Sequence, residues 1–312
     1  MVTSSTVIRE LTMNETLHRL SAFTQDPEGG NPAGVWLGDT LPQADAMQRI
    51  AAEVGYSETI FLAPLGAGRY MTRYYSPARE IDFCGHASIA AGVLLGSLKG
   101  EGTYRLETAV GEVPLEASHQ GGAWWATLES VSPQQRPAPP ALVAEALECL
   151  GWRPDELDPD LPPVLAYAGV WHLVLAAASH ERLARLDYDF DALEALMSRE
   201  GLTTLQLVWR DDEGVFHARN PFPVGGVVED PATGAAAAAL GGYLRDAGLV
   251  AAPASLTIIQ GETMGRPSRL EVTLPEHGGI RVSGTAVSLE PGGPEGDGRR
   301  NSEPSAAGSQ PR

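Results

Sequence analysis

Two stretches of small, apolar residues constrain the fold of this chain more than any other feature. One covers residues 83–95 (FCGHASIAAGVLL) and the other residues 230–240 (DPATGAAAAAL). Both have the composition of a helix without a polar face, and a helix that is apolar all round is buried all round. Alanine and glycine also let neighbouring strands approach closely. Each stretch therefore predicts a helix at the centre of a surrounding sheet.

The segments that precede the two stretches are alike, which indicates an internal pseudo-repeat. In both, a strand-like segment ends in a turn, at Ser76-Pro77 or at Asn220-Pro221, and a loop and a glycine follow before the helix. We predict an α+β fold with two pseudo-symmetric lobes, each a strongly bent sheet wrapped around one central buried helix.

Hydrophobic patterning supplies the remaining elements. Alternating or apolar runs predict strands, at 16–24, 33–37, 57–62, 123–129, 164–167, 171–176, 204–209, 255–259 and 269–273. Fourfold spacing of apolar residues predicts an amphipathic helix over 43–54, ended by Gly55. Further helices are expected near 141–150 and 189–199, with Asp189 as the N-cap of the second.

The length of 312 residues exceeds what one hydrophobic core usually serves, so two domains are expected. Residues 14–133 are assigned to an N-terminal lobe and 134–289 to a C-terminal lobe, whose last strand could return to the first lobe. The proline-rich segment 132–140 is the predicted linker. Residues 1–13 are expected to be a flexible leader, and 290–312, rich in Gly, Pro, Ser and charge, a disordered tail.

Charge and motif content exclude several classes of protein. The net charge is −18, without a Lys/Arg cluster, which argues against binding to nucleic acid or to an anionic membrane surface. The two cysteines are too few for a disulfide framework, and we expect a cytoplasmic protein. The HExxH and CxxC motifs are absent, so we predict no metal site. Without GxGxxG or GxxxxGK[ST], a dinucleotide or nucleotide site is not expected, and GxSxG is absent as well.

The starts of the two predicted buried helices are candidate binding sites. A helix N-terminus offers unpaired N–H groups and a partial positive charge, so two facing N-termini could hold a substrate carboxylate. The candidate amides belong to Gly85 and His86 in one helix and to Gly234 and Ala235 in the other. The alternative is that these glycines only permit tight packing of helix against sheet.

Three side chains are candidates for catalysis. Glu58 borders the apolar run 60–62, and apolar surroundings raise the pKa of a carboxyl toward a value suited to proton transfer. His86 and Asp230 lie at equivalent helix starts. Each also has a purely structural explanation, Glu58 as a solvated strand end, His86 as a helix-end partner and Asp230 as an N-cap before Pro231.

At these residues the chain resembles the PhzF-like phenazine-biosynthesis family. The resemblance covers nearly the whole ordered chain and rests on seven short blocks in order, at 23–24, 30–33, 56–59, 83–87, 230–234, 260–261 and 264–268. It implies a fold like that of diaminopimelate epimerase, with two similar lobes that each hold a mixed barrel-like sheet around a central helix. It also implies a homodimer without a cofactor.

The resemblance further implies a function, isomerisation of a small carboxylate such as trans-2,3-dihydro-3-hydroxyanthranilate. Glu58 matches the family's proton-carrying glutamate, and His86 and Asp230 match its supporting residues. Gly85, His86, Gly234 and Ala235 match the positions of the carboxylate-binding amides. Two alternatives stay open: an epimerase or lyase acting on an amino-acid-like carboxylate, and a non-catalytic binding protein on the same fold.

The chain departs from the family pattern at two positions. Ala235 stands where a polar residue is usual, which removes a hydroxyl contact but keeps the amide, and Glu28 replaces a phenylalanine near the expected cleft. The related epimerases use two cysteines. Cys84 matches the first of these, but Pro231 occupies the second position, so a two-thiol racemase is not expected.

Overall fold

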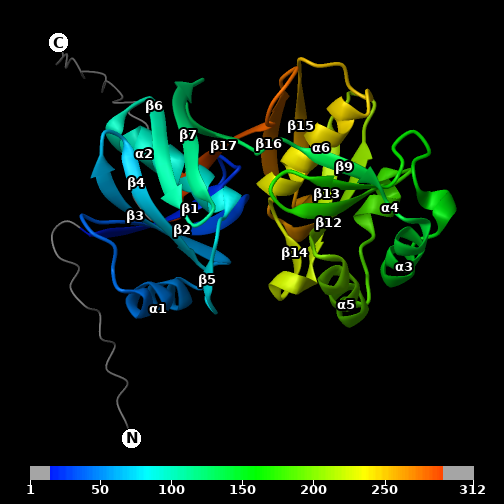
Figure 1. Ribbon diagram of the computed structural model, residues 1–312, viewed down its shortest axis with the longest axis horizontal. Coiled ribbons are helices and arrows are strands. Elements are labelled where there is room, and N and C mark those ends of the chain that lie inside the picture. The colour runs from blue at the N-terminus through cyan, green and yellow to red at the C-terminus, as the bar shows by residue number, and fades with distance from the viewer. Residues whose placement is uncertain (1–14, 291–312) are drawn as a thin grey trace, which may run out of the picture.

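The computed structural model describes residues 15–290 and contains two lobes, each with a helix at its centre (Figure 1). The predicted leader and all of the predicted tail beyond Glu290 lie outside the described residues. The sheet is mixed, because parallel strand pairs occur among antiparallel neighbours in both lobes. The protein is therefore of the α+β class, as predicted.

The strands of the first lobe form a closed ring around helix α2 (Gly85–Lys99). Pairing runs in the order β1, β2, β3, β4, β6, β7, β8 and β17, and β17 pairs with β1 again. The bounds are β1 (Thr16–Ala22), β2 (Asn31–Leu37), β3 (Glu58–Gly66), β4 (Arg69–Tyr75), β5 (Glu80–Ile81), β6 (Gly102–Thr108), β7 (Gly111–Gln120), β8 (Ala123–Glu129) and β17 (Arg281–Ser288).

Helix α2 is buried on every side, as its composition predicts. Each residue from His86 to Gly96 is buried, and the helix contacts β1, β2, β3, β7, β8 and β17. A Cβ atom added at Gly92 would lie 2.7 Å from the Cβ of Ala126 in β8. The absence of a side chain at Gly92 is therefore what lets the helix lie so close to the sheet.

In the second lobe, strands likewise surround a central helix, α6 (Gly234–Asp246), although no pairing of β17 with β9 closes their order among the described residues. Its strands pair in the order β9, β10, β11, β12, β13, β15, β16 and β17, with β14 beside β13. The bounds are β9 (Gln134–Pro137), β10 (Val164–Tyr167), β11 (Trp171–Ala176), β12 (Leu202–Arg210), β13 (Phe216–Phe222), β14 (Val227–Asp230), β15 (Ala254–Gln260) and β16 (Ser268–Leu274). All residues of α6 from Ala236 to Leu244 are buried.

Strand β17 joins the two lobes, because it pairs with β16 on one side and with β8 and β1 on the other. In Figure 1, β16 and β17 lie between the two central helices. A second junction is Arg266, which donates from Nε to the carbonyl of Gly30 at 2.7 Å and also bonds Ser21 and the carbonyl of Gly29. Strand β17 and Arg266 thus both hold the two lobes together.

Outer helices cover the sheets through smaller apolar cores. Helix α1 (Ala44–Val54) ends at Gly55 with a left-handed φ of 71°, as predicted, and packs on Trp36 and Phe61. Helices α3 (Pro140–Leu150) and α5 (Phe190–Glu200) form a core on the second lobe, and the Asp189 carboxylate caps α5 by accepting from the amide of Ala192. No helix of residues 15–290 is long and apolar enough to cross a membrane.

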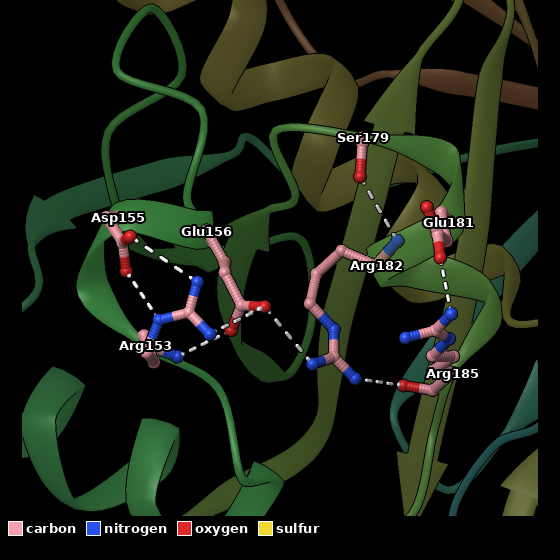
Figure 2. Close-up of polar contacts among 7 residues, drawn as sticks. All are labelled: Arg153, Asp155, Glu156, Ser179, Glu181, Arg182 and Arg185. Carbon is pink, nitrogen blue, oxygen red and sulfur yellow. Dashed lines mark hydrogen bonds and ion pairs between the residues drawn. The ribbon is translucent and has the colours of Figure 1, made fainter.

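An ion-pair network fixes the short helices of the second lobe, α4 (His180–Ala184) and the 3-10 turn η1 (Pro154–Glu156) (Figure 2). Arg182 of α4 lies 3.4 Å from a carboxylate oxygen of Glu156, which also contacts Arg153. Ser179 caps α4 by accepting from the amide of Arg182 at 3.2 Å. The network therefore holds α4 in place against the loop that precedes it.

Three local predictions were wrong. Asn220-Pro221 is not a turn but lies inside β13, and Pro221 pairs only with β14, where its missing N–H is tolerated. The turn comes later, in the 3-10 turn η2 (Pro223–Gly225). Asp230 is not the N-cap of α6, because Thr233 holds that position. The segment 132–140 is not only a linker, since it contains β9, which pairs along β10.

Candidate active site

The starting ends of two parallel strands place Asn31 and Glu58 at one edge of the first lobe. Strand β2 begins at Asn31 and β3 begins at Glu58, and the parallel register sets Ala33 opposite Glu58. Gly55 ends α1 in the left-handed conformation, and the backbone bends at residues 56–57 before β3 begins. Glu58 is thus the first residue of the strand after this bend. The Glu58 side chain is only 16 % exposed.

Helix α2 begins at the same edge and brings His86 to Glu58. The Nε2 atom of His86 lies 3.4 Å from a carboxylate oxygen of Glu58 and 3.5 Å from the Ser57 hydroxyl. Beneath it, the hydroxyl of Ser88 donates to the carbonyl of Cys84 at 2.7 Å and accepts from the Tyr74 hydroxyl. These buried hydrogen bonds fix the first turn of α2, and with it the imidazole ring.

Asn31 links the two lobes at this point. Its Nδ2 atom lies 2.9 Å from Oδ1 of Asp230, 3.1 Å from the carbonyl of Ala232 and 3.2 Å from Nδ1 of His86. An amide nitrogen carries two hydrogens, so it donates to two of these three acceptors at a time. The reverse orientation would set the amide oxygen against a carboxylate and a carbonyl, so the orientation is determined by its neighbours.

Gln260 holds Asp230 and the start of α6 from the other side. Its Nε2 atom donates to the carbonyl of Asp230 at 2.7 Å and to the Thr233 hydroxyl at 3.0 Å, while its Oε1 accepts from the Thr233 amide. The Thr233 hydroxyl in turn donates to Oδ2 of Asp230 at 2.6 Å. Sequence reasoning did not assign roles to Asn31, Gln260 or Thr233, although all three stand in blocks that carry the family resemblance.

Burial shifts the pKa of each ionisable group in this cluster. Burial raises the pKa of Glu58, opposed by hydrogen bonds from Ser57 and Cys84. Burial also raises the pKa of Asp230 to about 6, with the charge of Glu58 adding to the rise and His86, Thr233 and Asn31 opposing it. The pKa of His86 is lowered by burial, although Asp230 opposes this. The cluster thus favours a neutral imidazole between two carboxyl groups that bind protons more readily than usual.

The predicted carboxylate-binding amides all lie at the first turns of the central helices. Gly85 and His86 open α2, and Gly234 and Ala235 open α6, so their N–H groups have no acceptor within the helix. A Cβ atom added at Gly85 would meet nothing within 4 Å, whereas one at Gly234 would touch Phe23 at 3.7 Å. There is therefore open space beside the Cα atom of Gly85 at the start of α2.

A cavity of about 200 Å³ adjoins the cluster between the lobes. The first lobe lines it with Asn31, Pro32, Tyr56 and Ser57, and the second lobe with Val227 and residues 229–231. A larger hollow of about 450 Å³ lies beside β4 and β6 and contains none of the candidate residues. The smaller cavity reaches the cluster through Asn31, Ser57 and Asp230, although Glu58 and His86 are not among its lining residues.

Glu58, Cys84 and His86 are also residue types that ligate metals, and their ligating atoms lie within 4.8 Å of one another. A metal-binding cysteine must lose its proton. Burial and the nearby Glu58 raise the pKa of the Cys84 thiol well above its usual value, which favours the neutral thiol. The cluster is therefore better suited to proton transfer than to holding a cation.

The chain belongs to the phenazine biosynthesis-like protein family (PhzC-PhzF), whose model matches residues 20–292. An uncharacterised isomerase, YfhB of Bacillus subtilis, is 33 % identical over 285 residues, covering 87 % of this chain and 96 % of the relative. A trans-2,3-dihydro-3-hydroxyanthranilate isomerase of Pseudomonas fluorescens is 31 % identical over 280 residues, covering 86 % of this chain and 95 % of the relative. The predicted family and the predicted class of enzyme, an isomerase, agree with these relatives.

Solved structures share the fold. A predicted epimerase from Pseudomonas aeruginosa has a TM-score of 0.77 at 27 % identity, covering 89 % of this chain and 97 % of the other. A hydroxyproline epimerase from Agrobacterium vitis, solved with trans-4-hydroxy-L-proline, has a TM-score of 0.59 at 14 % identity, covering 88 % and 90 % of the two chains. The likeness to the second structure is a likeness of fold alone.

Proposed function

We propose that this protein is a cofactor-free isomerase that moves a proton on a small carboxylate, with Glu58 as the acid and base. The observation that carries the proposal is the partly buried Glu58 carboxyl group, which lies 3.4 Å from His86 and belongs to the residue directly after Ser57, one of the residues that line the cavity between the lobes. Relatives named trans-2,3-dihydro-3-hydroxyanthranilate isomerase support this compound, or a cyclic carboxylate like it, as the substrate.

The proposed reaction begins with a substrate carboxylate bound by the amides of Gly85, His86, Gly234 and Ala235. Such amides are fixed in direction and gain strength when the closed cleft excludes water. Because one helix starts in each lobe, their amides could donate to the substrate carboxylate from both sides of the cleft. Positioning alone can contribute several kcal/mol to lowering the barrier.

Glu58 then removes a proton from a carbon next to an unsaturated system and returns it to another carbon on the same face. A raised pKa suits this carboxyl group to both halves of the transfer, because the ionised form is a stronger base and the protonated form is easier to reach than in an ordinary glutamate. His86 and Asp230 orient the substrate, and Asn31 keeps them in register by bonding across the cleft.

The test is incorporation of deuterium from D₂O into trans-2,3-dihydro-3-hydroxyanthranilate by wild type, Glu58→Gln and Glu53→Gln. Glu53 is an exposed glutamate of α1 and serves as the matched control. We expect turnover by wild type and by Glu53→Gln, and a loss of about 10²–10⁴-fold in Glu58→Gln. Equal turnover in the two variants would refute the role of Glu58.

The alternatives give different results in the same assay. An epimerase or lyase acting on an amino-acid-like carboxylate would exchange the α-hydrogen of that compound with solvent, without migration of a double bond. A binding protein would exchange no hydrogen on any carboxylate, and Glu58→Gln would bind as wild type does. A homodimer, also proposed from the family resemblance, would elute at twice the chain mass of 33.0 kDa.

A further inference from the structure

A second cluster of ligating side chains lies on the second lobe, in a group separate from the Glu58 cluster. It consists of His180 at the start of α4, His217 in β13 and Glu262 in the 3-10 turn η3 (Glu262–Met264). One ligating atom from each residue lies within 4.8 Å of the other two. Nδ1 of His217 is already 2.8 Å from a carboxylate oxygen of Glu262.

Trp209 and Asp211 orient this cluster. The Trp209 ring packs against both imidazoles, with its centroid 5.1 Å from that of His180 and 5.3 Å from that of His217. The carboxylate of Asp211 lies 3.7 Å from Nε2 of His217, the nitrogen that faces away from Glu262. A histidine that ligates a metal usually directs its other ring nitrogen to such a carboxylate.

The backbone around the cluster is also held in place. Helix α4 carries His180 and is fixed by the Ser179 cap and by the Arg182–Glu156 contact (Figure 2). The three candidate ligands are partly or fully exposed, so a cation could reach them from solvent. A purely structural packing of the two imidazoles on Trp209 would not require carboxylates at both ring nitrogens of His217.

We propose that His180, His217 and Glu262 form a binding site for one divalent transition-metal ion of the zinc type. Two imidazoles and one carboxylate are a common zinc ligand set, with bonds of about 2.0–2.2 Å and water at the remaining position. In tetrahedral geometry the ligating atoms stand roughly 3.3 Å apart. The His217–Glu262 pair therefore needs to open slightly, and exposed His180 needs to turn inward.

The site would connect three elements of the second lobe. Glu262 lies between Gln260, which donates to the carbonyl of Asp230, and Arg266, which donates to the carbonyl of Gly30 in the first lobe. A bound ion would thus tie β13 and α4 to the segment that carries both contacts. This role is independent of the proposed isomerase, because none of the three ligands touches the cavity beside Glu58.

The test is calorimetric titration of ZnCl₂ into chelator-treated protein without a histidine tag. We expect one saturable site in wild type and binding weakened about tenfold or more in His217→Ala and in Glu262→Gln. His119→Ala is the matched control, because exposed His119 also packs on a tryptophan, Trp124 at 5.1 Å, but belongs to no such group of three among the described residues. This control should bind as wild type does.

Two further variants distinguish this site from the Glu58 cluster and from a loss of folding. Cys84→Ser should keep zinc binding, whereas loss of binding in Cys84→Ser alone would place the ion at the Glu58 cluster and overturn the proposal. Exposed Glu262 serves as the second ligand variant if His217→Ala does not fold. Equal affinity of Glu262→Gln and His119→Ala, or no saturable binding by wild type at millimolar ZnCl₂, would also overturn it.

Discussion

Replacement of Asp230 by asparagine should change how the stability of the protein depends on pH. The folded-state pKa of Asp230 is about 6, against an ordinary value of 3.8, because its carboxyl group is withdrawn from water and lies near Glu58. Between these two values the folded state binds a proton that the unfolded state has released. Wild type therefore loses stability as the pH rises from about 4 to about 6.

The magnitude follows from the size of this difference. A pKa displaced from 3.8 to about 6 corresponds to about 3 kcal/mol of differential stability. The asparagine side chain of the variant would not titrate, but its amide oxygen could still accept from Asn31. At pH 4 the unfolded-state carboxyl is already more than half ionised, so part of this difference is present there. The free energy of unfolding of Asp230→Asn, minus that of wild type, should therefore increase by about 2–2.5 kcal/mol between pH 4 and pH 7.

Urea unfolding, followed by tryptophan fluorescence at each pH, measures this difference. Wild type and variant share all other titrating groups, so most of the remaining pH dependence cancels in the subtraction. In a Glu58→Gln background the increase should be smaller, because the charge of Glu58 contributes to the raised pKa. A difference that stays constant from pH 4 to pH 7, or one that decreases, would refute the argument that the Asp230 carboxyl is desolvated.

Three further predictions concern packing and the junction between the lobes, and each is measured by urea unfolding unless stated otherwise. Asn31→Ala leaves buried acceptors in both lobes without their donor and should cost about 1–3 kcal/mol; an unchanged midpoint would contradict the bridging role. Gly92→Ala should cost about 1–3 kcal/mol by overpacking, while Gly85→Ala, with open space at its Cβ, should stay within about 0.5 kcal/mol but raise KM in the isomerase assay. Arg266→Ala should lower the free energy of unfolding by about 1.5–3 kcal/mol, because the Arg266 guanidinium donates to the carbonyls of Gly29 and Gly30 in the other lobe. Full stability in Arg266→Lys would contradict the view that these two simultaneous guanidinium bonds are needed.

The sequence by itself determined the class of fold and the chemical character of the site. The central helices follow from composition, because residues 85–96 and 234–244 lack a polar face and can fold only inside a sheet. Local signals also placed Gly55 at the end of α1 and Asp189 at the start of α5, since caps depend on residues within one turn. Glu58, His86 and Asp230 were predicted from residue type and resemblance, and the structure brings all three into one cluster.

Only the tertiary structure decided what connects these residues. Asn31 and Asp230 are 199 positions apart in the sequence, so no local pattern could pair them, and their contact exists because the two lobes meet at strand β17. The same holds for Asn220-Pro221, where pairing with β14 overrides a local turn signal. Strand pairing and burial depend on distant segments, and these long-range contacts set the pKa of Asp230, the position of Gln260 and the shape of the cleft.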